Sequence, residues 1–227
     1  MDKQKIKKII VISLLMICLK SNVWAKYIMD YQEQIIQINF DQTKPKITIS
    51  AIQNTNQGYE TFANQKAIII LQLNFSETIQ QKEGINKNNI LIKVEDKNII
   101  PQVFRIEKPE GNTQKLILQG ISGNGKLNIN IKQGSISDLV GWKNEEINLS
   151  TGIYIDNSPP EVTFITENAS EGETIGIIQA EKPIRPIQGW EQSNNQRIWK
   201  KVFKEKVIFP VAIDYAGNES GQEVKIE

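Results

Sequence analysis

The chain has 227 residues, with 27 basic and 26 acidic side chains, one cysteine and no histidine. The lack of histidine excludes imidazole general bases, Ser-His-Asp arrangements and zinc sites built on imidazole. Calcium, which binds oxygen ligands, is the one metal ion left to consider, and the length suits one large domain or two small ones.

The first 25 residues are typical of a secretory signal peptide. Four lysines precede an apolar run from Ile9 to Leu19, and Val23-Trp24-Ala25 supplies a plausible cleavage site. An uncleaved anchor is the less favoured alternative, because the run is shorter than the about 20 residues of a transmembrane helix. Lipidation of Cys18 is a minor alternative, since bulky residues flank it.

Cleavage after residue 25 changes the charge and chemistry of the chain. It removes five lysines, one aspartate and Cys18, which leaves a net charge near −3, no thiol nucleophile and no internal disulfide. A slightly negative chain argues against nucleic acid as a partner. We therefore expect a secreted protein that is extracellular or attached to the cell surface.

Two short patterns each occur twice in the remaining chain. A turn that begins with aspartate and ends in proline precedes an apolar strand at Asp41 and again at Asp156, and an Asp-x-x-Gly turn occurs at Asp138 and Asp214. Repeats of this kind indicate tandem modules of one architecture. We predict a lead-in over 26–40, with a short strand at 36–40, a first module over 41–155 and a second module over 156–227.

The first module contains many short segments of alternating polarity. The predicted strands are 47–52, 67–75, 90–94, 102–106, 115–119, 127–131 and 153–155. Glycine-rich turns separate them, and no apolar period of 3.6 residues is sustained. This pattern favours an all-β fold in which the strands form an antiparallel sandwich.

The second module is shorter and has fewer strands. The predicted strands are 161–165, 174–179, 198–203, 207–214 and 223–226. In the fourth of these, Val207, Phe209, Val211 and Ile213 are expected to share one face. Pro210 lies between them and donates no ladder hydrogen bond, so we expect a bulge or an exposed edge there.

Four stretches resemble the bacterial immunoglobulin-like modules that occur in tandem in secreted and cell-surface proteins. They are the Asp-to-Pro openings at Asp41 and Asp156, the Phe-Ser-Glu stretch at 75–77, the segment 123–138 and the Asp-x-Ala-Gly-Asn stretch at 214–218. The first module departs at Gly141-Trp142, where such modules more often have Gly-Asn. The resemblance implies an immunoglobulin-like sandwich with a spacer, adhesive or ligand-binding role, and it implies no catalytic residues.

The repeated aspartates have two interpretations. In a structural turn, Asp41, Asp138, Asp156 and Asp214 accept hydrogen bonds from nearby backbone N–H groups, while Gly141 and Gly217 adopt positive φ. Alternatively, the four carboxylates hold calcium between loops. Calcium takes six to eight oxygens, and the chain has no dense Asp-x-Asp-x-Asp run, so the structural turn is favoured and no cofactor is predicted.

Three tryptophans are the candidate ligand-binding residues. Trp142 lies in a predicted turn, Trp190 follows a glycine, and Trp199 begins a strand. Exposed indole rings stack on sugars, whereas buried tryptophans stabilise the cores of small sandwiches more often. Carbohydrate binding is therefore an alternative function, and it requires at least one exposed ring.

The sequence favours a non-catalytic protein. Glu77 and the pair Glu145-Glu146 could be imagined as glycosidase carboxylates, but adjacent residues on a strand point to opposite faces, and solvated surface positions explain them better. A hydrolase is the weakest alternative. We expect a structural or adhesive interaction module whose partner is a surface protein or a glycan.

Overall fold

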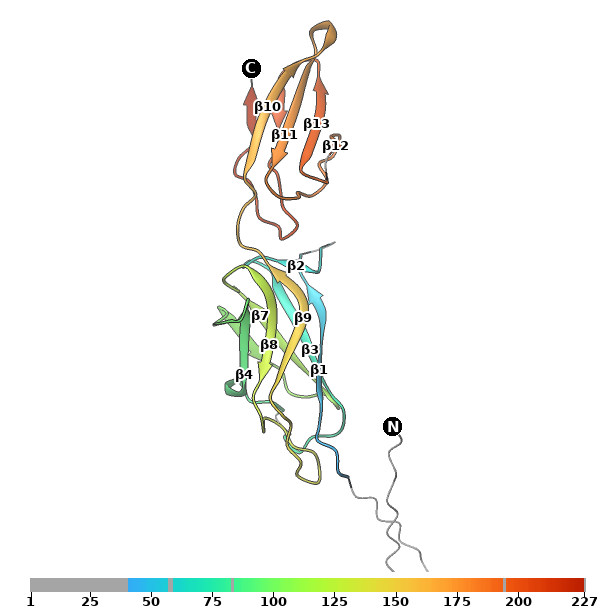
Figure 1. Ribbon diagram of the computed structural model, residues 1–227, viewed down its shortest axis with the longest axis vertical. Helices are drawn as coiled ribbons and strands as arrows, with labels where there is room; N and C mark the ends of the chain where they lie inside the picture. Colours follow the sequence, from blue (N-terminus) through green and yellow to red (C-terminus); the bar gives the residue numbers. More distant parts are fainter. Residues whose placement is uncertain (1–40, 57–58, 83, 194, 227) are drawn as a thin grey trace, which may run out of the picture. The chain divides into compact units, whose positions relative to one another are not determined.

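The computed structural model describes residues 41–56, 59–82, 84–193 and 195–226 (Figure 1). The predicted signal peptide and the lead-in strand at 36–40 lie outside this range. Apart from two single-turn 3-10 helices, η2 (Lys87–Asn89) and η3 (Ser170–Gly172), the regular elements of the described residues are all strands. None of the helices in this part of the chain has the length and apolar character needed to cross a membrane.

The first nine strands form two sheets, which we call the first sandwich. One sheet has the order β1 (Ile47–Asn54), β3 (Ile68–Phe75), β7 (Thr113–Gln119), β6 (Val103–Ile106). The other has the order β2 (Phe62–Ala63), β9 (Ile147–Ile155), β8 (Gly125–Ile131), β4 (Ile90–Val94), β5 (Lys97–Ile99). The strand pairs in these two sheets are antiparallel except the short β2–β9 pair, which is parallel. This order corresponds to the ABED and C′CFG sheets of an immunoglobulin sandwich, with β2 added at the edge of the second sheet.

Alternation of apolar and polar residues places the core of the first sandwich between its sheets. In β3 the side chains of Ile69, Leu71 and Leu73 are fully buried, and β8 contributes Leu127 and Ile129 from the facing sheet. Side chains alternate between the two faces of a strand, so these residues necessarily share the inner face. The hairpin between β4 and β5 turns through Glu95 and Asp96, both at positive φ, as a type I′ turn requires.

The remaining strands form the second sandwich. Its larger sheet has the order β10 (Val162–Asn168), β11 (Thr174–Ala180), β13 (Ile198–Phe203), β12 (Glu191–Ser193), which repeats the order of the four-stranded sheet of the first sandwich. Opposite lies the pair β14 (Val207–Phe209) and β15 (Val224–Ile226), with an isolated bridge between Ile184 and Asp214. The core is aromatic, because the ring of Trp190 packs 5.7 Å from Phe203 and 5.8 Å from Phe209.

The predicted strand 207–214 is wrong in its second half. β14 ends at Phe209, directly before Pro210. Beyond the proline the inward positions shift by one residue, so that Ala212 and Asp214 are buried while Val211 and Ile213 are only half-buried. The missing N–H of Pro210 interrupts the ladder, and the chain changes face there.

Some strands differ from expectation because they are very short or are defined by their partners. Local polarity patterns do not reveal β2, β5 or β12, which have two or three residues each, and β9 begins at Ile147 rather than at the predicted residue 153. The predicted fold class, an all-β chain of two immunoglobulin-like antiparallel sandwiches, is confirmed.

Candidate functional site

The Asp138 turn in the first sandwich is built by its own side chain. The Oδ1 atom of Asp138 accepts hydrogen bonds from the backbone N–H groups of Val140 and Trp142, both at 2.9 Å. Gly141 has φ of +97°, a conformation that favours glycine, and its N–H donates to the Asp138 carbonyl at 3.2 Å. The other carboxylate oxygen of Asp138 is buried and accepts no hydrogen bond from any described residue.

The Asp214 turn in the second sandwich has the same backbone geometry. Oδ1 of Asp214 accepts from the backbone N–H of Asn218 at 2.9 Å, and Gly217 has φ of +89°. Its Oδ2 atom, in contrast, accepts a hydrogen bond from the side chain of Asn218 at 2.9 Å and lies 2.8 Å from Nζ of Lys182. The two turns therefore have the same backbone conformation, but the groups around the second carboxylate oxygen differ.

The two opening aspartates also form local turns. Asp41 accepts from the N–H of Thr43 at 2.9 Å and from its hydroxyl at 2.7 Å. Asp156 accepts from the N–H of Ser158 at 3.0 Å. Both are Asx turns that precede a strand, and in each the carboxylate satisfies a backbone donor two residues ahead.

Lys182 joins two of these turns at the point where the sandwiches meet. Its Nζ atom lies 2.8 Å from Oδ2 of Asp156 and 2.8 Å from Oδ2 of Asp214, and it also donates to the carbonyl of Ser158. Burial acts to lower the pKa of Lys182, but the hydrogen bonds and charges of the two aspartates outweigh it and raise this pKa above the usual lysine value. An ammonium group thus occupies the position between these carboxylates that a metal ion would need.

Arg185 makes a second connection from the second sandwich to the first. Its guanidinium donates to the side-chain carbonyl of Asn56, and to the backbone carbonyls of Asp214 at 2.9 Å and Tyr215 at 3.3 Å. It also lies over the ring of Tyr59, 4.6 Å from the centroid, in a cation–π contact. One planar group therefore binds a loop of the first sandwich and a turn of the second.

Asn56 and three aromatic rings complete this contact. The side-chain amide of Asn56 is buried and donates to the carbonyl of Tyr215 at 2.6 Å and to that of Phe62 at 2.8 Å. The ring of Tyr215 packs 4.7 Å from Tyr59 and 5.9 Å from Phe62. Burial, and to a smaller extent Tyr59, raises the pKa of the Tyr215 hydroxyl, which donates to Gln196.

The linker between the sandwiches is fixed by side-chain amides. Asn157 donates from its side chain to the carbonyls of Ile121 at 3.1 Å and Gly123 at 2.6 Å, and it accepts from the N–H of Gln65 at 2.6 Å. The side chain of Asn218, in the second sandwich, donates to the carbonyl of Asp156 at 2.9 Å. We call the linker 156–158, together with Asn56, Tyr59, Lys182, Arg185 and 214–218, the joint.

The three predicted tryptophans lie in different surroundings. Trp190 and Trp199 are buried in the core of the second sandwich, with exposed fractions of 9% and 3%. Little of either ring is open to a sugar, although Trp190 contributes to the lining of a hollow of about 430 Å³ beside Lys201. Trp142 is 44% exposed and lies in the loop between β8 and β9. The structure therefore does not bring the three together into one binding surface.

Two carboxylates approach each other near the first Asp-x-x-Gly turn. An oxygen of Glu77 and one of Asp138 lie within 4.8 Å. Calcium takes oxygen ligands of this kind, so the pair is a candidate that a calcium titration can test. Glu145, another candidate acid, is exposed, and its hydrogen bond and ion pair with Lys44 lower its pKa.

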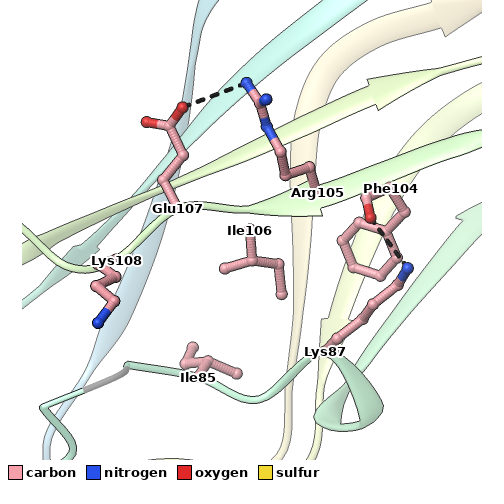
Figure 2. A pocket seen from close by; sticks show the side chains of 7 residues that line it. All are labelled: Ile85, Lys87, Phe104, Arg105, Ile106, Glu107 and Lys108. Carbon is pink, nitrogen blue, oxygen red and sulfur yellow. Dashed lines mark hydrogen bonds and ion pairs between the residues drawn. The ribbon is translucent and has the colours of Figure 1, made fainter.

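A shallow hollow of about 410 Å³ lies beside β6 at one edge of the first sandwich (Figure 2). Lys87 crosses it, with Nζ 4.7 Å from the centre of the Phe104 ring and 3.0 Å from the Phe104 carbonyl. Arg105 and Glu107 form an ion pair at 3.6 Å on its rim. Among the described residues that line this hollow, Glu107 supplies the carboxylate, and it already has a cationic partner, which is a poor arrangement for acid–base catalysis.

Sequence reasoning did not single out Asn56, Lys182 or Arg185. Their partners across the joint lie 24 to 159 residues away along the chain, and no local motif marks such pairs. The one local indication was the position of Asp156 and Asp214 in repeated motifs. That repetition shows that the turns are equivalent but does not show which cation lies between them.

Comparisons with known proteins give structural likenesses only. No protein-family model matches the chain, and no curated protein matches it. A chimeric titin Z1Z2-Z1Z2 tandem that carries a GRGDS peptide from fibronectin is similar at 11% identity with a TM-score of 0.28, covering 80% of this chain and 95% of that one. Bovine butyrophilin is similar at 9% identity with a TM-score of 0.31, covering 79% of this chain and 97% of that one. Both TM-scores are low, and the fold assignment therefore rests on the order of the strands in the sheets.

Proposed function

We propose that this chain is a non-catalytic, secreted or cell-surface protein in which two immunoglobulin-like sandwiches are held together by a fixed joint. Its role is structural and adhesive: it presents loops and sheet edges to a surface protein or a glycan. The sequence supports the location, through the signal peptide expected at residues 1–25. The resemblance to tandem bacterial modules supports the same role.

The observation that carries the proposal is the set of contacts across the joint. Arg185 binds Asn56 of the first sandwich, and Lys182 binds Asp156 of the linker and Asp214 of the second sandwich. Most paired domains in one chain are separated by a polar interface that allows relative motion. Here both cations are partly shielded from solvent and hydrogen-bonded to several groups, which favours a stiff connection suited to a spacer or to display.

The test is a distance measurement between the sandwiches. Spin labels are attached to Ile100→Cys in the first sandwich and Val202→Cys in the second, in the full chain with Cys18→Ser, because both positions are exposed, at 92% and 53%. Pulsed electron–electron double resonance is expected to give a narrow distribution of distances between the two labels. Arg185→Ala is expected to broaden it.

Arg105→Ala is the matched control. This arginine is exposed on β6, outside the joint, and forms an ion pair with Glu107 at 3.6 Å, so its loss should leave the distribution narrow. A distribution that is already broad before Arg185 is replaced would contradict the stiff joint. A narrow distribution that survives Arg185→Ala would show that the other joint contacts suffice without this arginine.

A further inference from the structure

Three apolar side chains project from one turn of the first sandwich. Leu139 is 67% exposed, Val140 is 62% exposed and Trp142 is 44% exposed, and all three belong to the loop between β8 and β9. Single exposed apolar residues are normal on a protein surface, whereas a contiguous group indicates a contact site. We call these three residues the tip.

The backbone of the tip is held firmly in place. Asp138 fixes the N–H groups of Val140 and Trp142, as described above. The neighbouring loop adds two bonds through Gln80, whose N–H donates to the Ser137 carbonyl at 2.8 Å and whose side chain donates to the Leu139 carbonyl at 3.3 Å. A tip that is already ordered loses little conformational freedom when it binds.

The tip lies at the end of the first sandwich at which β1 begins. Lys44, three residues before β1, forms an ion pair at 2.8 Å with Glu145, which belongs to the same loop as the tip. From this loop β9 runs to Ile155, where the linker of the joint begins. The tip is therefore at the opposite end of this sandwich from the joint. In the sequence, the segment before Lys44 contains the apolar run from Ile9 to Leu19.

We propose that the tip inserts into the interfacial zone of a lipid bilayer. Tryptophan favours this zone, and Leu139 and Val140 are suited to the adjacent acyl region. The exposed Lys143, next to Trp142, supplies a cation at the level of the headgroups.

The size of the tip favours a bilayer over a protein partner. A stable protein interface buries about 800 Å² on each side over about 20–30 residues, far more than three side chains provide. A bilayer accepts a small apolar projection without a complementary surface. This inference concerns the end of the sandwich away from the joint, and it does not depend on the function proposed above.

Tryptophan quenching tests the insertion directly. The full chain is mixed with phosphatidylcholine vesicles whose acyl chains carry bromine near the glycerol end, and emission is compared with that in unbrominated vesicles. Trp142→Phe removes one emitter, so the difference between the two proteins isolates Trp142 from Trp24, Trp190 and Trp199. We expect the brominated lipid to quench the emission assigned to Trp142.

Paired variants separate insertion from general attachment. Leu139→Ser with Val140→Ser is expected to abolish most of the Trp142 quenching, because the apolar part of the tip is lost. Ile100→Ser with Val202→Ser alters two other exposed apolar residues and should leave the quenching unchanged. The idea is overturned if brominated lipid does not quench Trp142. It is also overturned if Trp142 emission shifts with protein concentration in the absence of lipid, since that result indicates a protein contact.

Discussion

The two Asp-x-x-Gly turns predict unequal losses of stability for the same substitution. Asparagine in place of Asp138 or Asp214 keeps an Oδ1 acceptor for the backbone N–H groups of the turn. It replaces the other oxygen with an NH₂ group. At Asp214 this group would face the ammonium of Lys182 and the amide of Asn218, which are both donors. At Asp138 it would replace a buried oxygen that no described residue binds.

The expected magnitudes follow from these surroundings. Removal of one partner of a buried ion pair costs about 3–5 kcal/mol, but Lys182 is 21% exposed and keeps Asp156, so we expect Asp214→Asn to lower the free energy of unfolding by about 2 kcal/mol. Asp138→Asn removes a negative charge that lies within 4.8 Å of Glu77. We expect it to change the free energy of unfolding by less than about 1 kcal/mol, in either direction.

Unfolding in urea measures both variants. Emission from Trp190 and Trp199 reports the second sandwich, because both rings are buried in its core. Far-ultraviolet circular dichroism reports the whole fold and serves for Asp138→Asn. Alanine at Asp138 or Asp214 also removes the Oδ1 acceptor of the turn, so each alanine variant should destabilise the sandwich that contains it. If Asp138→Asn costs as much as Asp214→Asn, the assignment of the difference to Lys182 is refuted.

Three further outcomes are expected. The raised pKa of Lys182 means that the folded state holds this proton more tightly. Its contribution to the free energy of unfolding should therefore be constant below the usual lysine pKa and be lost as pH rises through the folded value, and Lys182→Met should reduce this alkaline loss in urea titrations. Gly176→Ala should lower the free energy of unfolding by about 1–3 kcal/mol, because its Cβ would lie 3.0 Å from the Phe203 ring; an unchanged midpoint would contradict this packing. Calcium should leave the melting temperature unchanged, whereas a saturable rise that Asp138→Asn abolishes would establish that Glu77 and Asp138 hold the ion.

Local chemistry in the sequence was enough to predict the strands with long alternating patterns and the repeated turns. Ile69, Leu71 and Leu73 alternate over a full strand, and the period of two leaves only one face for the core. Asp138 and Gly141 identify their turn because the bonds that form it join residues at most four apart. The order of the strands in the four-stranded sheet is the same in both sandwiches, as the repeated motifs indicated.

The tertiary structure decided the features that depend on distant partners. β2, β5 and β12 are too short to show a period, and they exist because a longer strand lies beside them. The exposure of a tryptophan is likewise a property of its neighbours, so Trp142 and Trp190 could not be distinguished by sequence. The joint depends on contacts such as Arg185 to Asn56, 129 residues apart. Periodicity and turn chemistry act over a few residues, whereas ion pairs and burial depend on which segments the fold brings together.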